Sequence, residues 1–191
     1  MQRMIVYVHG SKRVGKTVLA QELVQRALAA GIVAETASIV GVMRQHIKDM
    51  FSLTDEHVHG DLKETPLPEC SGHSARELMD DFVTWHFQRD PSRMCFIRGC
   101  MADIERRDDV GLFCIQDVIH AHEPPCIREA AARMGAAAVG VHVSRPGHTD
   151  TYGVNMPPEQ FDITVANTGT LEEYLAKAEG VLARVRQLRG V

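Results

Sequence analysis

Apolar and polar positions follow two distinct patterns along this chain. Short, nearly continuous apolar runs are typical of strands buried in a parallel sheet, whereas apolar residues recurring every three or four positions are typical of one helix face. Runs of the first kind predict strands at residues 3–8, 32–37, 111–117, 137–143 and 161–165. Segments of the second kind predict helices at residues 18–28, about 40–51, 75–87, about 90–105 and 171–188. Strands separated by helices indicate an α/β fold with a five-stranded parallel sheet and helices on both faces.

Residue types at the ends of these segments support several of the boundaries. Gly31 follows the first helix, as glycine commonly does, and residues 170–173 form a capping pattern before the last helix. Residues 71–74 offer a cap for the helix predicted at residue 75. The polar, proline-containing segment 54–72 predicts a loop-rich stretch, and residues 120–123, which precede two consecutive prolines, also suit a loop.

The segment between the first strand and the first helix is a complete phosphate-loop motif of the form G-x-x-x-x-G-K-T. It reads Gly10-Ser11-Lys12-Arg13-Val14-Gly15-Lys16-Thr17. In such a loop, backbone N–H groups point at phosphate oxygens at the positive end of a helix dipole. Lys16 would reach the β- and γ-phosphates, and the Thr17 hydroxyl would bind Mg²⁺. Because a strand precedes the motif and a helix follows it, the sequence predicts a protein that binds a nucleoside triphosphate.

Composition limits the class of protein further. The 191 residues, 45% of them hydrophobic, suit a single enzyme-sized domain, and the net charge of −4 does not favour a nucleic-acid binder. No apolar run approaches the ~18 residues of a membrane span, and the first strand follows the N-terminus at once, so we expect neither a membrane segment nor a signal peptide. Five cysteines without C-x-x-C spacing indicate reduced thiols and a cytoplasmic protein.

Further motifs, in order along the chain, carry a resemblance to a known family. They are Lys63-Glu64-Thr65-Pro66-Leu67-Pro68, Ser74-Ala75-Arg76-Glu77-Leu78-Met79, Gln116-Asp117-Val118, Val141-His142-Val143-Ser144-Arg145-Pro146, and the ending from Phe161-Asp162 to Asn167-Thr168-Gly169-Thr170-Leu171-Glu172-Glu173. Together with the phosphate loop, they resemble the phage deoxynucleoside monophosphate kinases, within the nucleoside monophosphate kinase group of P-loop proteins. The resemblance runs nearly end to end and implies one P-loop kinase domain over residues 1–191 that uses ATP and Mg²⁺. Within it, residues of about 40–107 would bind the acceptor, and residues of about 145–158 would form a lid.

Candidate site residues outside the phosphate loop come from position and from the resemblance. Asp117 ends the central strand, where a carboxylate would hold Mg²⁺, serve as a general base, or be a purely structural acid. Arg145 begins the lid segment, where it would neutralise the transferring phosphoryl group; the alternative is an ordinary surface arginine. The resemblance assigns Asn167 to nucleotide binding. The candidates for acceptor contact are Glu64, Arg76, Trp85 and His120.

The chain departs from the family at one position that bears on the acceptor. Ile119 stands where the family has an arginine, and an apolar side chain donates nothing to a phosphate dianion. Relatives of these kinases phosphorylate the 5-hydroxymethyl group of 5-hydroxymethyluracil in phage DNA. We therefore favour that hydroxyl as the acceptor, and the alternative is a free deoxynucleoside monophosphate.

The sequence also leaves a third class of function to consider, and it gives expectations for location and partners. A third hypothesis is a P-loop regulator or assembly ATPase that hydrolyses ATP without an acceptor. If the protein is phage-encoded, we expect it in the host cytoplasm, and a homodimer is possible. We expect ATP, with modified phage DNA or a free deoxynucleoside monophosphate, as its partners, and no membrane.

Overall fold

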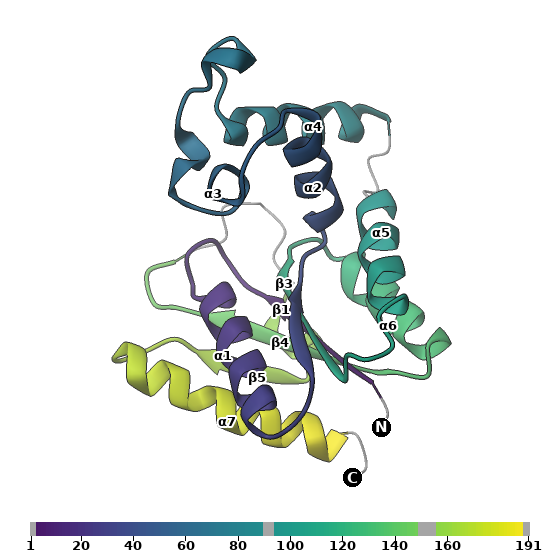
Figure 1. Ribbon diagram of the computed structural model, residues 1–191. Coiled ribbons are helices and arrows are strands. Elements are labelled where there is room, and N and C mark those ends of the chain that lie inside the picture. The colour runs from purple at the N-terminus through teal and green to yellow at the C-terminus, as the bar shows by residue number, and fades with distance from the viewer. Residues whose placement is uncertain (1–2, 90–93, 149–155, 189–191) are drawn as a thin grey trace. The chain divides into compact units, whose positions relative to one another are not determined.

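A computed structural model describes residues 3–89, 94–148 and 156–188 of the protein (Figure 1). Contacts within the chain divide it into two units. The first unit combines Met1–Ser38 with Met101–Val191, and the second is Ile39–Cys100. No helix among the described residues combines the length and the apolar character needed to cross a membrane. All five cysteines are free thiols, as their number and spacing predict.

The first unit is built on a parallel sheet. Its strands are β1 (Met4–His9), β2 (Ala34–Ala37), β3 (Leu112–Val118), β4 (Ala137–Ser144) and β5 (Ile163–Ala166). Their order is β2-β3-β1-β4-β5, and every neighbouring pair is parallel. This confirms the predicted five-stranded parallel sheet. Because β1 is central, the carboxyl ends of β3 and β4 flank the point where the chain leaves β1.

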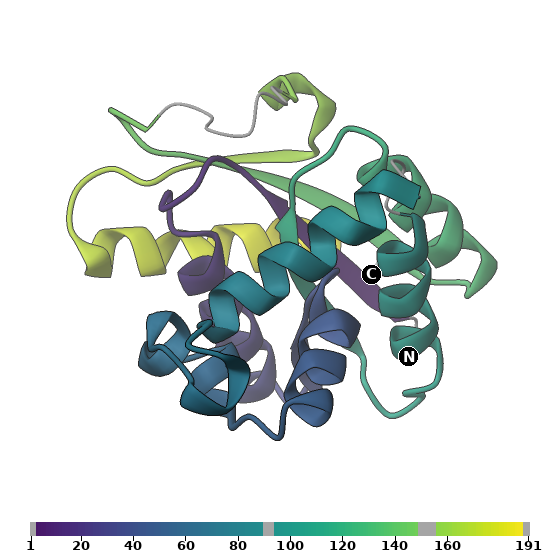
Figure 2. The same ribbon diagram turned by 90° about the horizontal axis from the view of Figure 1, so that it is seen from above.

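Helices cover both faces of this sheet. In the first unit, α1 (Lys16–Ala29) and α7 (Leu171–Leu188) pack together on one face, and α6 (Glu123–Arg133) packs on β4 from the other (Figure 2). A short turn, η3 (Pro158–Gln160), precedes β5. Helix α5 (Met94–Glu105) continues from the second unit into the first. The first part of the helix predicted over residues 90–105 lies outside the described residues.

The second unit is helical in the part of the chain that the structure describes. Its elements are α2 (Gly41–Met50), α3 (Asp55–Val58), η1 (Asp61–Glu64), η2 (Pro68–Cys70), α4 (Ala75–Arg89) and the beginning of α5. The stretch predicted to be rich in loops, residues 54–72, also contains the unpredicted short elements α3, η1 and η2. These elements are three or four residues long, too short to produce a periodic apolar pattern.

Side-chain caps begin α4 and α7. At α4, the Ser74 N–H donates to Glu77 Oε2 at 2.8 Å, and the Glu77 N–H donates to Ser74 Oγ at 3.3 Å. At α7, the Thr170 N–H donates to Glu173 Oε2 at 2.7 Å, and the Glu173 N–H donates to Thr170 Oγ1 at 3.2 Å. Both reciprocal pairs are capping boxes, which confirms the predicted helix starts.

Helix α6 is absent from the predicted elements. Its first residue is Glu123, followed directly by Pro124 and Pro125. Proline disrupts a helix interior but is tolerated in the first turn, where its missing N–H would have no intrahelical partner. The loop expected at residues 120–123 is therefore correct up to His122, and the prolines begin a helix rather than continue a loop.

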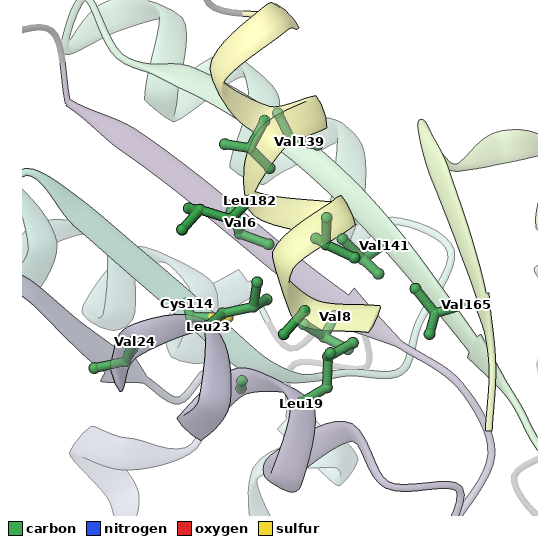
Figure 3. Close-up of a cluster of buried hydrophobic side chains, with 14 of the residues drawn as sticks. Val6, Val8, Leu19, Leu23, Val24, Cys114, Val139, Val141, Val165 and Leu182 are labelled. Atoms are coloured by element: carbon green, nitrogen blue, oxygen red, sulfur yellow. The ribbon is translucent and has the colours of Figure 1, made fainter. Parts of the chain in front are cut away.

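The main apolar core lies between the sheet and the α1–α7 pair (Figure 3). It joins Val6 and Val8 of β1 to Leu19 and Leu23 of α1 and to Leu182 of α7, all at most 1% exposed. Burial of branched aliphatic side chains contributes roughly 1.5–3 kcal/mol each. This core fixes the position of α1 relative to β1, and so fixes both ends of the phosphate loop.

The opposite face of β1 contains a close contact between a glycine and an aromatic ring. Tyr7 is fully buried, and a Cβ atom added to Gly140 of β4 would lie 2.7 Å from the Tyr7 hydroxyl oxygen and 2.8 Å from its ring. Since a buried tyrosine has little room to move, Gly140→Ala is expected to destabilise the protein by roughly 1–3 kcal/mol. Urea unfolding would measure the change.

Gly180 provides the matched control. It lies inside α7 with no atom within 4 Å of its added Cβ, so Gly180→Ala is expected to stabilise the protein by about 0.5–1 kcal/mol through helix propensity. A Gly140→Ala variant as stable as the unaltered protein would contradict the close packing of β4 against Tyr7.

Candidate active site

The phosphate loop runs from the end of β1 into α1 and contains three backbone positions with positive φ. These are Gly10 at 149°, Arg13 at 65° and Gly15 at 103°. A Cβ on Gly10 would collide with the carbonyl oxygen of Val143 in β4. Left-handed positions of this kind turn successive N–H groups into one concave surface, which is the geometry of an anion-binding nest. The backbone shape therefore suits the phosphate binding that the motif predicts.

Two side chains from the C-terminal part of the chain anchor the loop. Asn167 Nδ2 donates to the Val14 carbonyl oxygen at 2.8 Å, and Tyr174 Oη donates to the Gly15 carbonyl oxygen at 3.0 Å. A Cβ on Gly15 would lie 2.8 Å from Asn167 Nδ2 and 3.0 Å from the Tyr174 ring. Burial raises the pKa of the Tyr174 hydroxyl to about 12, so this group remains a donor at neutral pH. Only glycine fits at position 15 while both anchors are in place.

The lysine of the motif lies within the loop. Lys16 Nζ donates to the carbonyl oxygens of Gly10 and Ser11, both at 2.7 Å. These contacts hold the ammonium group beside the N–H groups of the nest. An anion bound there would meet a positive charge and backbone donors together.

A cavity of about 410 Å³ opens beside the loop. It is lined by Arg13, Gly15, Lys16, Thr17 and Val18 on the loop side, and by Arg145, Asn167, Gly169, Leu171 and Tyr174 on the other. The cavity thus brings together six site residues that the sequence predicts: Arg13, Gly15, Lys16, Thr17, Arg145 and Asn167. Three of the lining side chains are cationic, so the cavity favours an anionic ligand.

Asp117 lies at the carboxyl end of β3, next to β1 in the sheet. Its Oδ2 accepts a hydrogen bond from the Ser38 hydroxyl at 2.6 Å. Ser38 directly follows β2, the neighbour of β3 on its other side. In open parallel sheets, ligands bind at the carboxyl ends of the strands, the edge on which Asp117 and the phosphate loop both lie.

Two further candidates lie on connections at the same edge. Arg145 directly follows β4, and residues 149–155 of the predicted lid segment 145–158 lie outside the described residues. His120 lies between β3 and α6, and its ring stacks on that of His122 with centroids 5.6 Å apart and an interplanar angle of 12°. The stacked rings fix one side of the β3–α6 connection.

The remaining candidates belong to the second unit. Arg76 Nε donates to Glu64 Oε1 at 3.1 Å, so the structure brings these two together. Burial, with the nearby charges of Arg76 and Arg44, lowers the pKa of Lys63 to about 8. Cations therefore gather around Lys63 closely enough to disfavour its charged form.

Trp85 lies on α4, the helix that also carries Arg76. Its side chain is half exposed, and the Arg89 guanidinium lies 4.1 Å from the centre of its ring. Phe82 and His86 are its aromatic neighbours within the helix, at centroid distances of 6.4 Å and 4.9 Å. The structure therefore offers an exposed aromatic surface in this unit.

Sequence reasoning missed several residues that shape the site. Tyr174 was not a candidate because a tyrosine at a periodic apolar position of a helix is typical of core packing. Ser38 gave no motif signal, since its role depends on pairing between strands far apart in sequence. A strand ending in a hydroxyl residue is the one weak signal that could have indicated it.

No protein-family model matches this sequence, and no curated protein matches it either. Solved structures do match. APS kinase CysC of Mycobacterium tuberculosis, in complex with AMPPNP and APS, shares 12% identity over 95% of this chain and 98% of that chain, with a TM-score of 0.56. A gluconokinase of Sinorhizobium meliloti shares 15% identity over 98% of each chain, with a TM-score of 0.50. APE1195 shares 11% identity over 97% of this chain and 96% of that chain, with a TM-score of 0.61.

Identities this low show the fold alone. The fold is that of the P-loop kinases, of the nucleoside monophosphate kinase-like type. This confirms the fold class predicted from the sequence.

The anchoring of the loop by Tyr174 can be tested with a single substitution. Tyr174→Phe removes the side-chain donor to the Gly15 carbonyl oxygen, which keeps the Leu19 N–H as its backbone donor, and leaves the ring in place. We expect the affinity for ATP with Mg²⁺ to fall about 2- to 10-fold, the effect of one neutral hydrogen bond. A nucleotide titration followed by fluorescence or calorimetry would measure it.

Tyr7→Phe is the control, because Tyr7 is equally buried but faces the other side of β1. It should leave nucleotide affinity unchanged. Equal affinities in both variants would show that Tyr174 does not support the loop.

Proposed function

We propose that this protein is a kinase that transfers the γ-phosphate of ATP to an acceptor. The observation that carries the proposal is the cavity beside the phosphate loop, where Lys16, Thr17 and Arg145 meet. Phosphoryl transfer requires little of the protein beyond positioning and neutralisation of charge on the phosphoryl oxygens. A nest of N–H groups with converging cations supplies both.

The residues present suit ATP and Mg²⁺. The N–H groups of residues 10–17 and the Lys16 ammonium would hold the phosphates, and Arg145 would approach the transferring group. Asn167 would act on the nucleotide through the loop that it anchors. Thr17 and Asp117 offer the hydroxyl and carboxylate oxygens that Mg²⁺ prefers. Bound Mg²⁺ would neutralise charge on the phosphates.

The acceptor that we favour is the 5-hydroxymethyl group of 5-hydroxymethyl-deoxyuridine in phage DNA, which would make the protein a DNA-modifying enzyme of the host cytoplasm. Its support is Ile119, an apolar residue on the connection that directly follows Asp117 and Val118. A hydroxyl acceptor loses a proton as the bond forms, and a carboxylate such as Asp117 would accept it. Glu64, Arg76, Trp85 and His120 are the proposed acceptor contacts.

A free deoxynucleoside monophosphate is the second candidate acceptor. It is favoured by the cations of the second unit, where burial, and after it the nearby charges of Arg76 and Arg44, lower the pKa of Lys63. Such a cluster suits a phosphate dianion. The acceptor oxygen of a monophosphate is already anionic, so this reaction would need no general base.

Removal of the loop lysine tests the transfer chemistry. Lys16→Ala is expected to lower turnover about 10²-fold or more, because one preorganised charge at the developing transition state contributes several kcal/mol. Steady-state release of ADP in the presence of acceptor would measure it. Arg133→Ala, which removes an exposed cation of α6, is the control. A near-normal rate for Lys16→Ala would show that the chemistry occurs elsewhere.

A panel of acceptors tests the choice between the two substrates. Labelled ATP is offered with free deoxynucleoside monophosphates, with plain DNA and with DNA that contains 5-hydroxymethyluracil. We expect label on the modified DNA and poor use of the monophosphates, since the missing arginine contact is worth about 10- to 100-fold in phosphate affinity. Ile119→Arg should improve use of monophosphates without improving the DNA reaction.

Efficient phosphorylation of free monophosphates, with none on modified DNA, would overturn the favoured acceptor. Release of ADP that no acceptor stimulates would instead favour an ATPase.

A further inference from the structure

One peptide unit at the end of β3 is held at both of its ends by buried side chains. It is the unit that joins Val118 to Ile119. Its carbonyl oxygen accepts a hydrogen bond from His9 Nδ1 at 3.1 Å, and its N–H donates to Glu123 Oε2 at 2.6 Å. His9 is 5% exposed and Glu123 is 2% exposed. Because a carbonyl oxygen only accepts, Nδ1 of His9 carries the hydrogen.

Each of these two side chains is itself held in place. The His9 ring stacks on Phe161, with centroids 5.0 Å apart and an angle of 7°, and lies 5.4 Å from His142. Burial lowers the pKa of His142, with Glu159 opposing the shift, so the ring beside His9 is uncharged at neutral pH.

The Glu123 carboxylate also accepts from the His120 N–H at 2.8 Å, and the Glu123 N–H donates to the His120 carbonyl oxygen at 2.9 Å. A carboxylate buried this deeply requires such hydrogen bonds to replace its hydration. The connection between β3 and α6 is thereby folded around Glu123.

The pairing of β1 with β3 is irregular beside this peptide unit. Tyr7 of β1 pairs with Ile115 of β3, but His9, two residues later, pairs with Val118 rather than with Asp117. The end of β3 therefore contains one extra residue, a bulge at Gln116–Asp117. Bulges turn the direction of a side chain and are common beside active sites. Here Asp117 itself lies within the bulge.

We propose that His9 and Glu123 are positioning residues that hold this bulge and so orient Asp117 beside the phosphate loop. His9 directly precedes Gly10, so the same side chain links the start of the loop to the strand that carries Asp117. The expected effect on turnover, through Asp117, rests on the proposed kinase function. The structural part, that His9 and Glu123 hold the bulge, does not. Misplacement of a catalytic group by about 1 Å costs as much as 10²-fold in rate.

Two pairs of variants separate the hydrogen bonds from the packing. Glu123→Ala removes the acceptor, whereas Glu123→Gln retains an acceptor oxygen. His9→Phe keeps a ring to stack on Phe161 but removes the donor, whereas His9→Asn keeps a donor close to the position of Nδ1. We expect kcat to fall about 10- to 100-fold in Glu123→Ala and His9→Phe, with partial rescue in the two conservative variants. KM for ATP should change little, and the Mg²⁺ concentration needed for half-maximal activity should rise. Glu129→Gln, at an exposed position of α6, is the matched control.

A second background tests whether the effect acts through Asp117. Asp117→Asn should itself lower kcat strongly, and adding Glu123→Ala to it should cost little more, because residues that act through one another are not additive. Full additivity, or losses no larger than in Glu129→Gln, would overturn the proposal.

Amide hydrogen exchange in the nucleotide-free protein gives a readout that needs no activity. Glu123→Ala should accelerate exchange at the N–H groups of Ile119 and His120, and Glu129→Gln should not. Unchanged exchange at both positions would overturn the structural part of the proposal.

If the unaltered protein transfers no phosphate to any acceptor, the kinase proposal fails by itself. Exchange, together with the Mg²⁺ dependence of ATP binding, then still decides the role of His9 and Glu123.

Discussion

The phosphate loop depends on hydrogen-bond donors that lie outside it. Its left-handed positions turn N–H groups toward a ligand, so the carbonyl oxygen of Val14 needs a donor from elsewhere, and that of Gly15, which accepts from the Leu19 N–H, takes a second donor. Asn167 and Tyr174 supply them. Because Tyr174 lies on α7, the loop keeps its shape only while α7 is packed against α1 and the sheet. The core in Figure 3 therefore supports the site directly.

Most of the fold could be predicted from the sequence because buried parallel strands and amphipathic helices have different periods. The strands, most of the long helices and the capping boxes of α4 and α7 follow from local residue types. The failures have local causes as well. Helix α6 has Pro124 and Pro125 directly after its first residue, and the usual effect of proline is to end a helix. The elements between residues 54 and 72 are only three or four residues long, about one helical turn, which is too short for an apolar pattern to repeat.

In the candidate site, too, local features could be predicted and contacts between distant segments could not. Lys16 and Thr17 follow from a motif, and Asp117 follows from its place at the end of an apolar strand. The contacts that orient these residues join segments far apart in the chain, such as Ser38 with Asp117 and His9 with Val118. A one-residue bulge leaves no trace in composition or periodicity. Residue chemistry was therefore predictable, whereas the orientation of each group was not.

The anchoring of the phosphate loop by α7 also has a consequence for how the protein is made. Val14 and Asn167 are 153 positions apart, and Gly15 and Tyr174 are 159 apart. Contacts with such large sequence separation form late, since the intervening chain must first be ordered. A ribosome releases the loop more than 150 residues before it releases these two anchors. The nascent chain would then gain its affinity for nucleotide only when α7 docks on α1 and the sheet, so nucleotide binding would report that this unit has folded.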